Sequence, residues 1–165
     1  MPASEQHVAQ DRYTVIPRTA IFVRDVDSYL LMKGAANKQL WPGKYNGVGG
    51  HVDRGEDILA SANRELREET GLEARLWLCG TVVVDAGDIG VGLYVFTGEA
   101  SRGILRESGE GAAEWVRFDR IFSLPTVEDV PQLIARIHAM HRGDPPFSAR
   151  SHYAAAGRLK IEFAE

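Results

Sequence analysis

The sequence has little of several features that define whole classes of protein. It contains one cysteine, which excludes an intramolecular disulfide and an all-cysteine metal cluster. No apolar run approaches the roughly 18 residues of a membrane-spanning helix, and residues 1–12 lack the apolar core of a signal peptide. Basic residues are not in excess, since the net charge is −4, which argues against binding to a nucleic-acid backbone. We therefore expect a cytoplasmic protein that binds neither a membrane nor a nucleic-acid polymer.

The chain length of 165 residues predicts one domain. We expect a flexible tail over residues 1–12 and a single domain over residues 13–165, with a helix over 58–70 and another over 127–140. Apolar patterns predict strands over residues 13–23, 28–32, 76–84, 91–97, 114–118 and 158–163, and a short strand near Val48. Strands interrupted by two helices indicate a mixed sheet packed between helices.

The predicted helix over residues 58–70 presents three carboxylates on one face. Asp57 is a plausible N-cap and Gly71 stands where a helix ends in a left-handed residue. Glu65, Glu68 and Glu69 fall within an arc of about 100°, where like charges repel by roughly 0.2–0.5 kcal/mol per pair. A divalent cation would reverse this repulsion, and oxygen ligands suit Mg²⁺ or Mn²⁺. The alternative is a solvated helix face neutralised by its own arginines.

The spacing around this helix favours the metal site. Gly50 is followed after five residues by Glu56, and after seven more by the run RELREETGL from Arg64 to Leu72. This pattern resembles the signature of the Nudix hydrolases at every fixed position. The resemblance implies an α/β fold, an α/β/α sandwich around a central mixed β-sheet, with the signature forming a loop, helix and loop.

The resemblance also implies a reaction and roles for the signature residues. The reaction is the Mg²⁺-dependent hydrolysis of a nucleoside diphosphate linked to another group, with Mn²⁺ as a possible substitute and a small nucleotide as the partner of a monomer or homodimer. The metal ligands would be Glu65, Glu68, Glu69 and the carbonyl of Gly49, with Glu68 and Glu69 also catalytic. Arg64 would orient the glutamates, and Glu56, Gly50 and Gly71 would be structural.

Residues outside the signature resemble the MutT-type hydrolases of oxidised purine nucleoside triphosphates, whose substrates include 8-oxo-dGTP. The run KYNGVGG over residues 44–50 looks like their base-contacting loop, in which Asn46 would bind the purine edge; the alternative is a simple turn. Glu110 would be an extra metal ligand or general base, or else a solvated loop acid. Glu128 and Asp129 would recognise the base, or else cap a helix. Lys33 and Lys44 would contact the phosphates.

A departure from that group leaves other functions open. Thr126 and Val127 stand where close relatives have an aromatic residue over the base, so Trp41 and Tyr45 become the candidates for stacking. Alternatives are a non-catalytic, nucleotide-sensing Nudix domain and a hydrolase of dihydroneopterin triphosphate or ADP-ribose. Retention of the three glutamates favours an enzyme. The lack of proline between Pro42 and Pro125 argues against the ADP-ribose branch, which usually carries one beyond the signature.

Overall fold

The structure is a computed structural model that describes residues 12–37, 40–100, 103–106, 108–109, 111–154 and 157–165. The expected N-terminal tail, apart from Arg12, therefore lies outside the described residues. The described part of the chain contains no helix long and apolar enough to cross a membrane.

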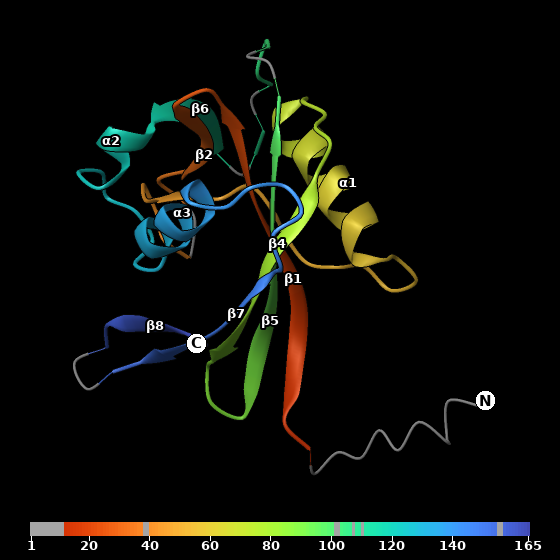
Figure 1. Ribbon diagram of the computed structural model, residues 1–165, viewed down its shortest axis with the longest axis vertical. Coiled ribbons are helices and arrows are strands. Elements are labelled where there is room, and N and C mark those ends of the chain that lie inside the picture. The colour runs from red at the N-terminus through yellow and green to blue at the C-terminus, as the bar shows by residue number, and fades with distance from the viewer. Residues whose placement is uncertain (1–11, 38–39, 101–102, 107, 110, 155–156) are drawn as a thin grey trace.

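A mixed, curled β-sheet forms the centre of the molecule (Figure 1). Its strands run in the order β3-β2-β1-β5-β4-β7-β8, and β6 pairs with β2. The β1/β5 and β4/β7 pairs are parallel, whereas the other pairs are antiparallel. The strands are β1 (Thr14–Asp25), β2 (Ser28–Gly34), β3 (Tyr45–Asn46), β4 (Trp77–Asp85), β5 (Ile89–Glu99), β6 (Gly111–Arg117), β7 (Phe147–Tyr153) and β8 (Leu159–Phe163).

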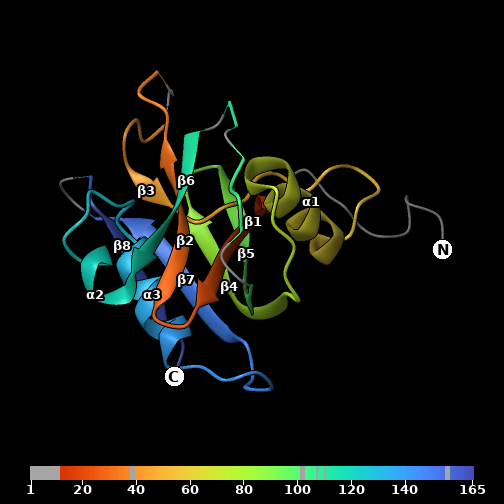
Figure 2. The same ribbon diagram turned by 90° about the horizontal axis from the view of Figure 1, so that it is seen from above.

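Helices cover the sheet on both sides, which confirms the predicted sandwich. Helix α1 (Ile58–Thr70) lies on one side, and α2 (Phe118–Ile121) and α3 (Val130–His138) lie on the other, as the view from above shows (Figure 2). Alternate residues of β1 enter two separate cores: Ile21 packs with α1, and Phe22 packs on the side of α3. The lower ends of β1, β4 and β5 extend beyond the helices (Figure 1).

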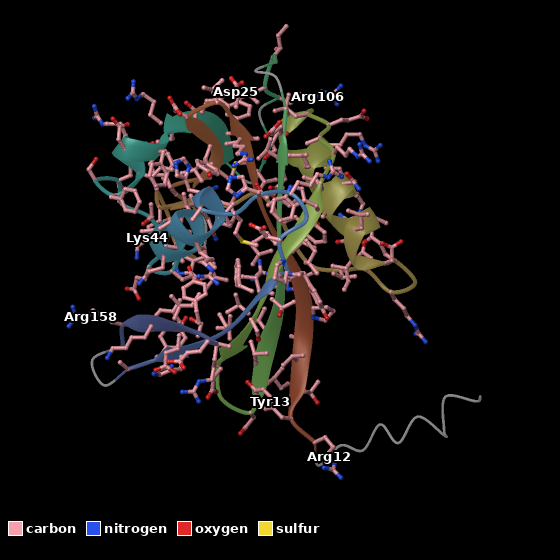
Figure 3. The ribbon with its side chains drawn as sticks, in the orientation of Figure 1. Arg12, Tyr13, Asp25, Lys44, Arg106 and Arg158 are labelled. Carbon is pink, nitrogen blue, oxygen red and sulfur yellow. The ribbon has the colours of Figure 1, made fainter. Side chains whose placement is uncertain are left out.

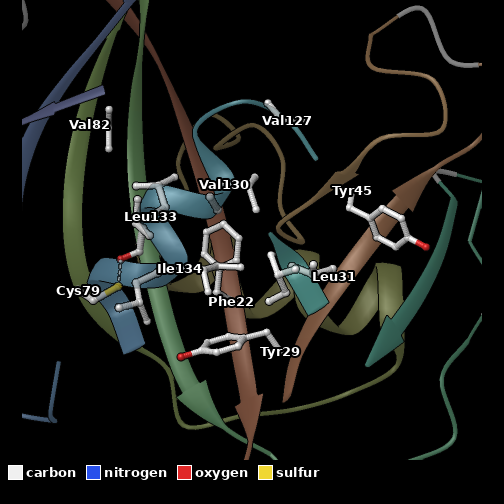
Figure 4. Close-up of a cluster of buried hydrophobic side chains, with 14 of the residues drawn as sticks. Phe22, Tyr29, Leu31, Tyr45, Cys79, Val82, Val127, Val130, Leu133 and Ile134 are labelled. Atoms are coloured by element: carbon white, nitrogen blue, oxygen red, sulfur yellow. Dashed lines mark hydrogen bonds between the residues drawn. The ribbon is translucent and has the colours of Figure 1, made fainter. Parts of the chain in front are cut away.

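The core on the side of α3 contains the single cysteine (Figure 4). Cys79 is fully buried, and its thiol donates a hydrogen bond to the carbonyl of Val95 at 3.3 Å. Burial raises the pKa of this thiol to about 12, so it stays protonated and unreactive. Cys79 is therefore a core residue.

Helix α1 begins and ends where the sequence predicts. The side chain of Asp57 accepts hydrogen bonds from the backbone N–H groups of Leu59 and Ala60, each at 2.9 Å. Gly71 ends the helix with a φ of 76°, and its N–H donates to the carbonyl of Arg67. Both signals act within a few residues, so no distant contact is needed to set these boundaries.

Removing the cap should loosen the first turn of α1. We expect Asp57→Ala to lower the free energy of unfolding by about 1 kcal/mol, because two backbone N–H groups lose their acceptor. Urea unfolding measures the change. Asp57→Asn is the matched control, since the amide oxygen caps almost as well; an equal loss in both variants would contradict the capping role.

Other boundaries differ from the predictions. Helix α3 spans Val130–His138, which is shorter than the expected 127–140, and Val48 forms only an isolated bridge to Ile21. A last strand was predicted over residues 158–163, where the structure has β8, but β7 just before it was not predicted. Strand β7 buries Ala149 and Ser151, whose small side chains produce a weak hydrophobic pattern. Helix α2 is a single turn that the sequence did not indicate.

Candidate functional site

The three glutamates of α1 line an open cavity of about 680 Å³. The opposite wall is the glycine-rich segment after β3, which runs antiparallel to β1 through bridges between Arg18 and His51 and between Ile21 and Val48. This segment brings Gly49 and Gly50 against the helix. The structure therefore brings together the residues that the signature predicts as a metal site, and their roles stay predictions.

Arg64 connects the loop before α1 to the glutamates on it. Its guanidinium donates to both carboxylate oxygens of Glu56 at 2.9 Å, to Glu65 at 2.8 Å and to Glu68 at 3.3 Å. It also donates to the carbonyl of His51 at 3.2 Å. These bonds raise the pKa of Arg64, so its charge is permanent. The geometry agrees with the expected orienting role of Arg64 and places Glu56 on its far side, away from the other carboxylates.

The ion pair between Glu56 and Arg64 makes folding stability depend on pH. Hydrogen bonds from Arg64 lower the pKa of Glu56 from 4.5 to about 2. Because the pKa in the folded protein is the lower one, the pair stabilises the fold fully above the unfolded value, and this contribution is lost as the pH falls from about 4.5 towards 2.

We therefore expect Glu56→Gln to lower stability at neutral pH and to flatten its decline in acid. Urea unfolding of both proteins, from neutral pH down to about pH 2, checks this. The two curves should converge at the acidic end; parallel curves would mean that Glu56 has the same pKa in the folded and unfolded chain.

The backbone of Gly49 and Gly50 closely approaches the carboxylates of Glu69 and Glu65. The N–H of Gly49 donates to Glu69 at 3.2 Å, and Glu69 is only 8% exposed. A side chain at Gly50 would place its Cβ 2.5 Å from the carboxylate of Glu65 and would displace that carboxylate from its present position. The structure thus gives a steric reason for glycine at this position of the signature.

The chemistry of these donors fits a hard divalent cation. Glu65, Glu68, Glu69 and the carbonyl of Gly49 supply only oxygen atoms, as Mg²⁺ and Mn²⁺ prefer. In the part of the chain that is described, no three His, Cys, Asp or Glu side chains lie close enough together to hold a metal ion. Glu65 and Glu68 instead accept hydrogen bonds from Arg64, and Glu69 accepts one from the N–H of Gly49.

A second, more apolar cavity of about 250 Å³ opens from the first. It lies over the face of the sheet that carries α3. Its walls include Leu93 of β5, Leu133 of α3 and Tyr153 of β7. The two cavities share six lining residues, which are Arg18, Leu40, Trp41, Asn46, Gly47 and Gly49. An acidic site and an apolar site therefore form one continuous depression.

Asn46 and Asp129 both line the second cavity. The alternative interpretation, a simple turn at Asn46 and Gly47, is wrong because Asn46 belongs to β3; its side-chain oxygen accepts the N–H of Gly47 at 2.8 Å. Asp129 is 8% exposed and makes no capping hydrogen bond to the described residues of α3, and burial raises its pKa. Glu128 is exposed and accepts the N–H of Leu159 at 2.5 Å, which ties the start of α3 to β8. Base recognition by Glu128 stays a prediction.

The two lysines expected at the phosphates lie in different places. Lys44 lines the larger cavity (Figure 3), whereas Lys33 lies with its ammonium 5.5 Å from the ring centre of Tyr45 and is not among the described lining residues. Tyr45 is buried, and its hydroxyl donates to Glu114 at 2.6 Å, which raises its pKa to about 12. Trp41 lines both cavities and has a φ of 52°, an uncommon conformation for a tryptophan. Of the two stacking candidates, only Trp41 lines the cavities.

One predicted residue stays untested, and one residue that lines the cavities was not predicted. Glu110, the proposed extra ligand or base, lies outside the described residues, so its role stays a prediction. Arg18 lines both cavities although the sequence analysis did not single it out. A lone arginine within a strand gives no local signal, because its position depends on which segments pair with that strand.

Comparison with known proteins identifies the family. The model of the NUDIX domain matches residues 15–137. Proteins named oxidized purine nucleoside triphosphate hydrolase are 32% identical over 104 residues in Danio rerio and 30% identical over 95 residues in Mus musculus. These matches span 61% and 55% of this chain, and 67% and 60% of the relatives' own lengths.

A solved structure agrees over a larger part of the chain. The MutT protein of Bacillus halodurans superposes with a TM-score of 0.75 at 25% identity, covering 90% of this chain and 97% of that protein. Nudix hydrolases generally use divalent metal ions, which agrees with the oxygen donors on α1. The signature, the sandwich and the family match lead to the same conclusion: the chain belongs to the Nudix hydrolase family.

Proposed function

We propose that this protein is a Mg²⁺-dependent pyrophosphohydrolase of purine nucleoside triphosphates, with an oxidised purine such as that of 8-oxo-dGTP as the preferred base. The products are a nucleoside monophosphate and pyrophosphate, and Mn²⁺ can replace Mg²⁺. The observation that carries the proposal is the junction of the two cavities. An acidic cavity suited to metal and phosphate opens into an apolar cavity that holds an amide and a carboxyl group.

In this proposal the acidic cavity holds the polyphosphate. Glu65, Glu68, Glu69 and the carbonyl of Gly49 hold the cation, which when bound neutralises phosphate oxygens and lowers the pKa of water. Arg64 fixes Glu65 and Glu68 through its hydrogen bonds. Lys44 supplies a further positive charge to the same cavity.

Hydrolysis needs a group that takes a proton from water. Of the three glutamates on α1, Glu68 is the most accessible, with a side chain 60% exposed against 14% for Glu65. We assign to it the proton of the attacking water, whose oxygen bonds to phosphorus while the bond from phosphorus to the leaving pyrophosphate oxygen breaks. Glu110 is the second candidate for this proton.

The apolar cavity would hold the purine. Trp41 offers a ring for stacking, and Asn46 offers both a donor and an acceptor to the purine edge. The carboxyl group of Asp129 adds an acceptor when ionised and a donor when protonated. Burial raises its pKa, which favours the protonated form. Oxidation of a purine changes its donors and acceptors, so these groups can distinguish the modified base. The names of the relatives in zebrafish and mouse support this substrate class.

A substrate panel tests the proposal. The protein is incubated with Mg²⁺ and, separately, 8-oxo-dGTP, the four ordinary deoxynucleoside triphosphates, dihydroneopterin triphosphate, ADP-ribose and a dinucleoside polyphosphate. We expect 8-oxo-dGTP to give the highest kcat/KM, with monophosphate and pyrophosphate as products and no reaction after chelation of the metal. Preference for another compound would overturn the substrate class, and no hydrolysis of any compound would overturn the enzymatic function.

A further inference from the structure

Arg18 lies at the junction of the two cavities. It precedes the buried part of β1, and its bridge partner is His51 in the segment that follows the two glycines. The N–H of the next residue, Thr19, donates to the carbonyl of Gly50 at 2.9 Å, so this part of β1 is fixed to the signature loop. The half-buried side chain of Arg18 lines both the acidic cavity and the apolar one.

No anionic group of the described residues binds the guanidinium of Arg18. Among the described residues it forms neither an ion pair within 4.0 Å nor a side-chain hydrogen bond, although four carboxylates line the larger cavity. Three of these carboxylates form ion pairs with Arg64, and the fourth, that of Glu69, accepts a hydrogen bond from the N–H of Gly49. A partly desolvated cation without a partner is unfavourable, and an anionic ligand removes that cost.

The apolar cavity, which Arg18 also lines, contains the acidic side chain of Asp129, and this carboxyl group does not neutralise the arginine. Its pKa is raised by burial, with a smaller contribution from Glu128, whereas a nearby guanidinium would lower it. The charge of Arg18 is therefore available to a ligand that passes from one cavity into the other.

We propose that Arg18 binds the phosphate group attached directly to the nucleoside, with its planar guanidinium donating to the two non-bridging oxygens. This inference rests on the proposed function, because a nucleotide with its base in the apolar cavity and its outer phosphates at the glutamates places that phosphate at the junction. Arginine suits this role since two parallel N–H groups match two phosphate oxygens. Arg18 would then make the site bind a nucleotide more tightly than the corresponding nucleoside.

Calorimetric titration without metal tests the contact separately from catalysis. The ligands are 8-oxo-dGMP, dGMP and the nucleoside 8-oxo-deoxyguanosine, and the proteins are the wild type, Arg18→Gln and Arg18→Lys. We expect Arg18→Gln to weaken binding of both monophosphates by about 10- to 100-fold, the effect of a lost charged hydrogen bond, and to leave nucleoside binding within about twofold. Arg18→Lys should recover part of the loss, because it keeps the charge without the paired donors.

Arg12→Gln is the matched control, since Arg12 is exposed just before the same strand (Figure 3) and is not among the residues that line either cavity. It should bind all three ligands as the wild type does. Unchanged monophosphate affinity in Arg18→Gln, equal weakening for the nucleoside, or a wild type that binds no monophosphate would each overturn the inference. The proposed function is judged independently by the substrate panel, so a wild type that hydrolyses 8-oxo-dGTP with an inert Arg18→Gln change would refute this inference alone.

Discussion

Replacing Glu69 by glutamine should abolish most of the catalytic activity and preserve the fold. Glutamine has the same length, and its amide oxygen can still accept the N–H of Gly49, now 3.2 Å from the carboxylate. It lacks the negative charge that a divalent cation requires. We expect kcat to fall about a thousandfold, equivalent to about 4 kcal/mol in the transition state, with little change in the free energy of unfolding.

The matched control for this variant is Glu73→Gln. Glu73 is exposed just beyond the end of α1 and is not among the residues that line either cavity. The same loss of charge there should leave kcat unchanged. Near-normal turnover in Glu69→Gln would show that Glu69 is not a metal ligand, and an equal loss in both variants would point to a general electrostatic effect.

Replacing Gly49 by alanine should damage both the fold and the site. Gly49 has a φ of +146°, and a Cβ there would lie 2.2 Å from the backbone carbonyl oxygen of Thr19. Since that oxygen belongs to the central strand β1, the glycine-rich segment must move away from the sheet. We expect the free energy of unfolding to fall by about 2–4 kcal/mol and kcat to fall by about a hundredfold or more, because the proposed metal-binding carbonyl is displaced.

Gly87→Ala separates this collision from backbone strain. Gly87 lies between β4 and β5 with a φ of +102°, and a Cβ there would meet no atom within 4 Å. It should cost about 1 kcal/mol of stability and leave kcat unchanged. Urea unfolding and steady-state kinetics on both variants make the comparison. Equal stability losses would show that the contact with Thr19 is relieved without moving the loop.

The sequence predicts features that depend on neighbouring residues. Helix α1 has the predicted bounds because its cap at Asp57, its apolar stripe and its stop at Gly71 all act within one or two turns. Glu65 and Glu68 share a face for the same local reason, and Arg64 reaches both from the same helix. The fixed helical period thus determines how the glutamates of the acidic cavity are placed relative to one another.

Features that depend on strand pairing were not predictable. The apolar cavity combines Arg18 of β1, Leu93 of β5 and Tyr153 of β7. These strands lie in one part of the sheet because β1 pairs with β5, β5 with β4, and β4 with β7. Lys33 illustrates the same limit, because its register opposite Tyr45 places it over that ring. A shift of one residue would have reversed its face.

Direct binding of Mn²⁺ tests the central claim, that the acidic face of α1 is a metal site. Electron paramagnetic resonance measures the concentration of free Mn²⁺ while the metal is titrated into the wild type, Glu69→Gln or Glu73→Gln. The measurement does not depend on the identity of the substrate. We expect saturable binding to the wild type and to Glu73→Gln, and an affinity at least about tenfold weaker in Glu69→Gln. Equal affinity in all three proteins, or no binding to the wild type, would contradict the assignment.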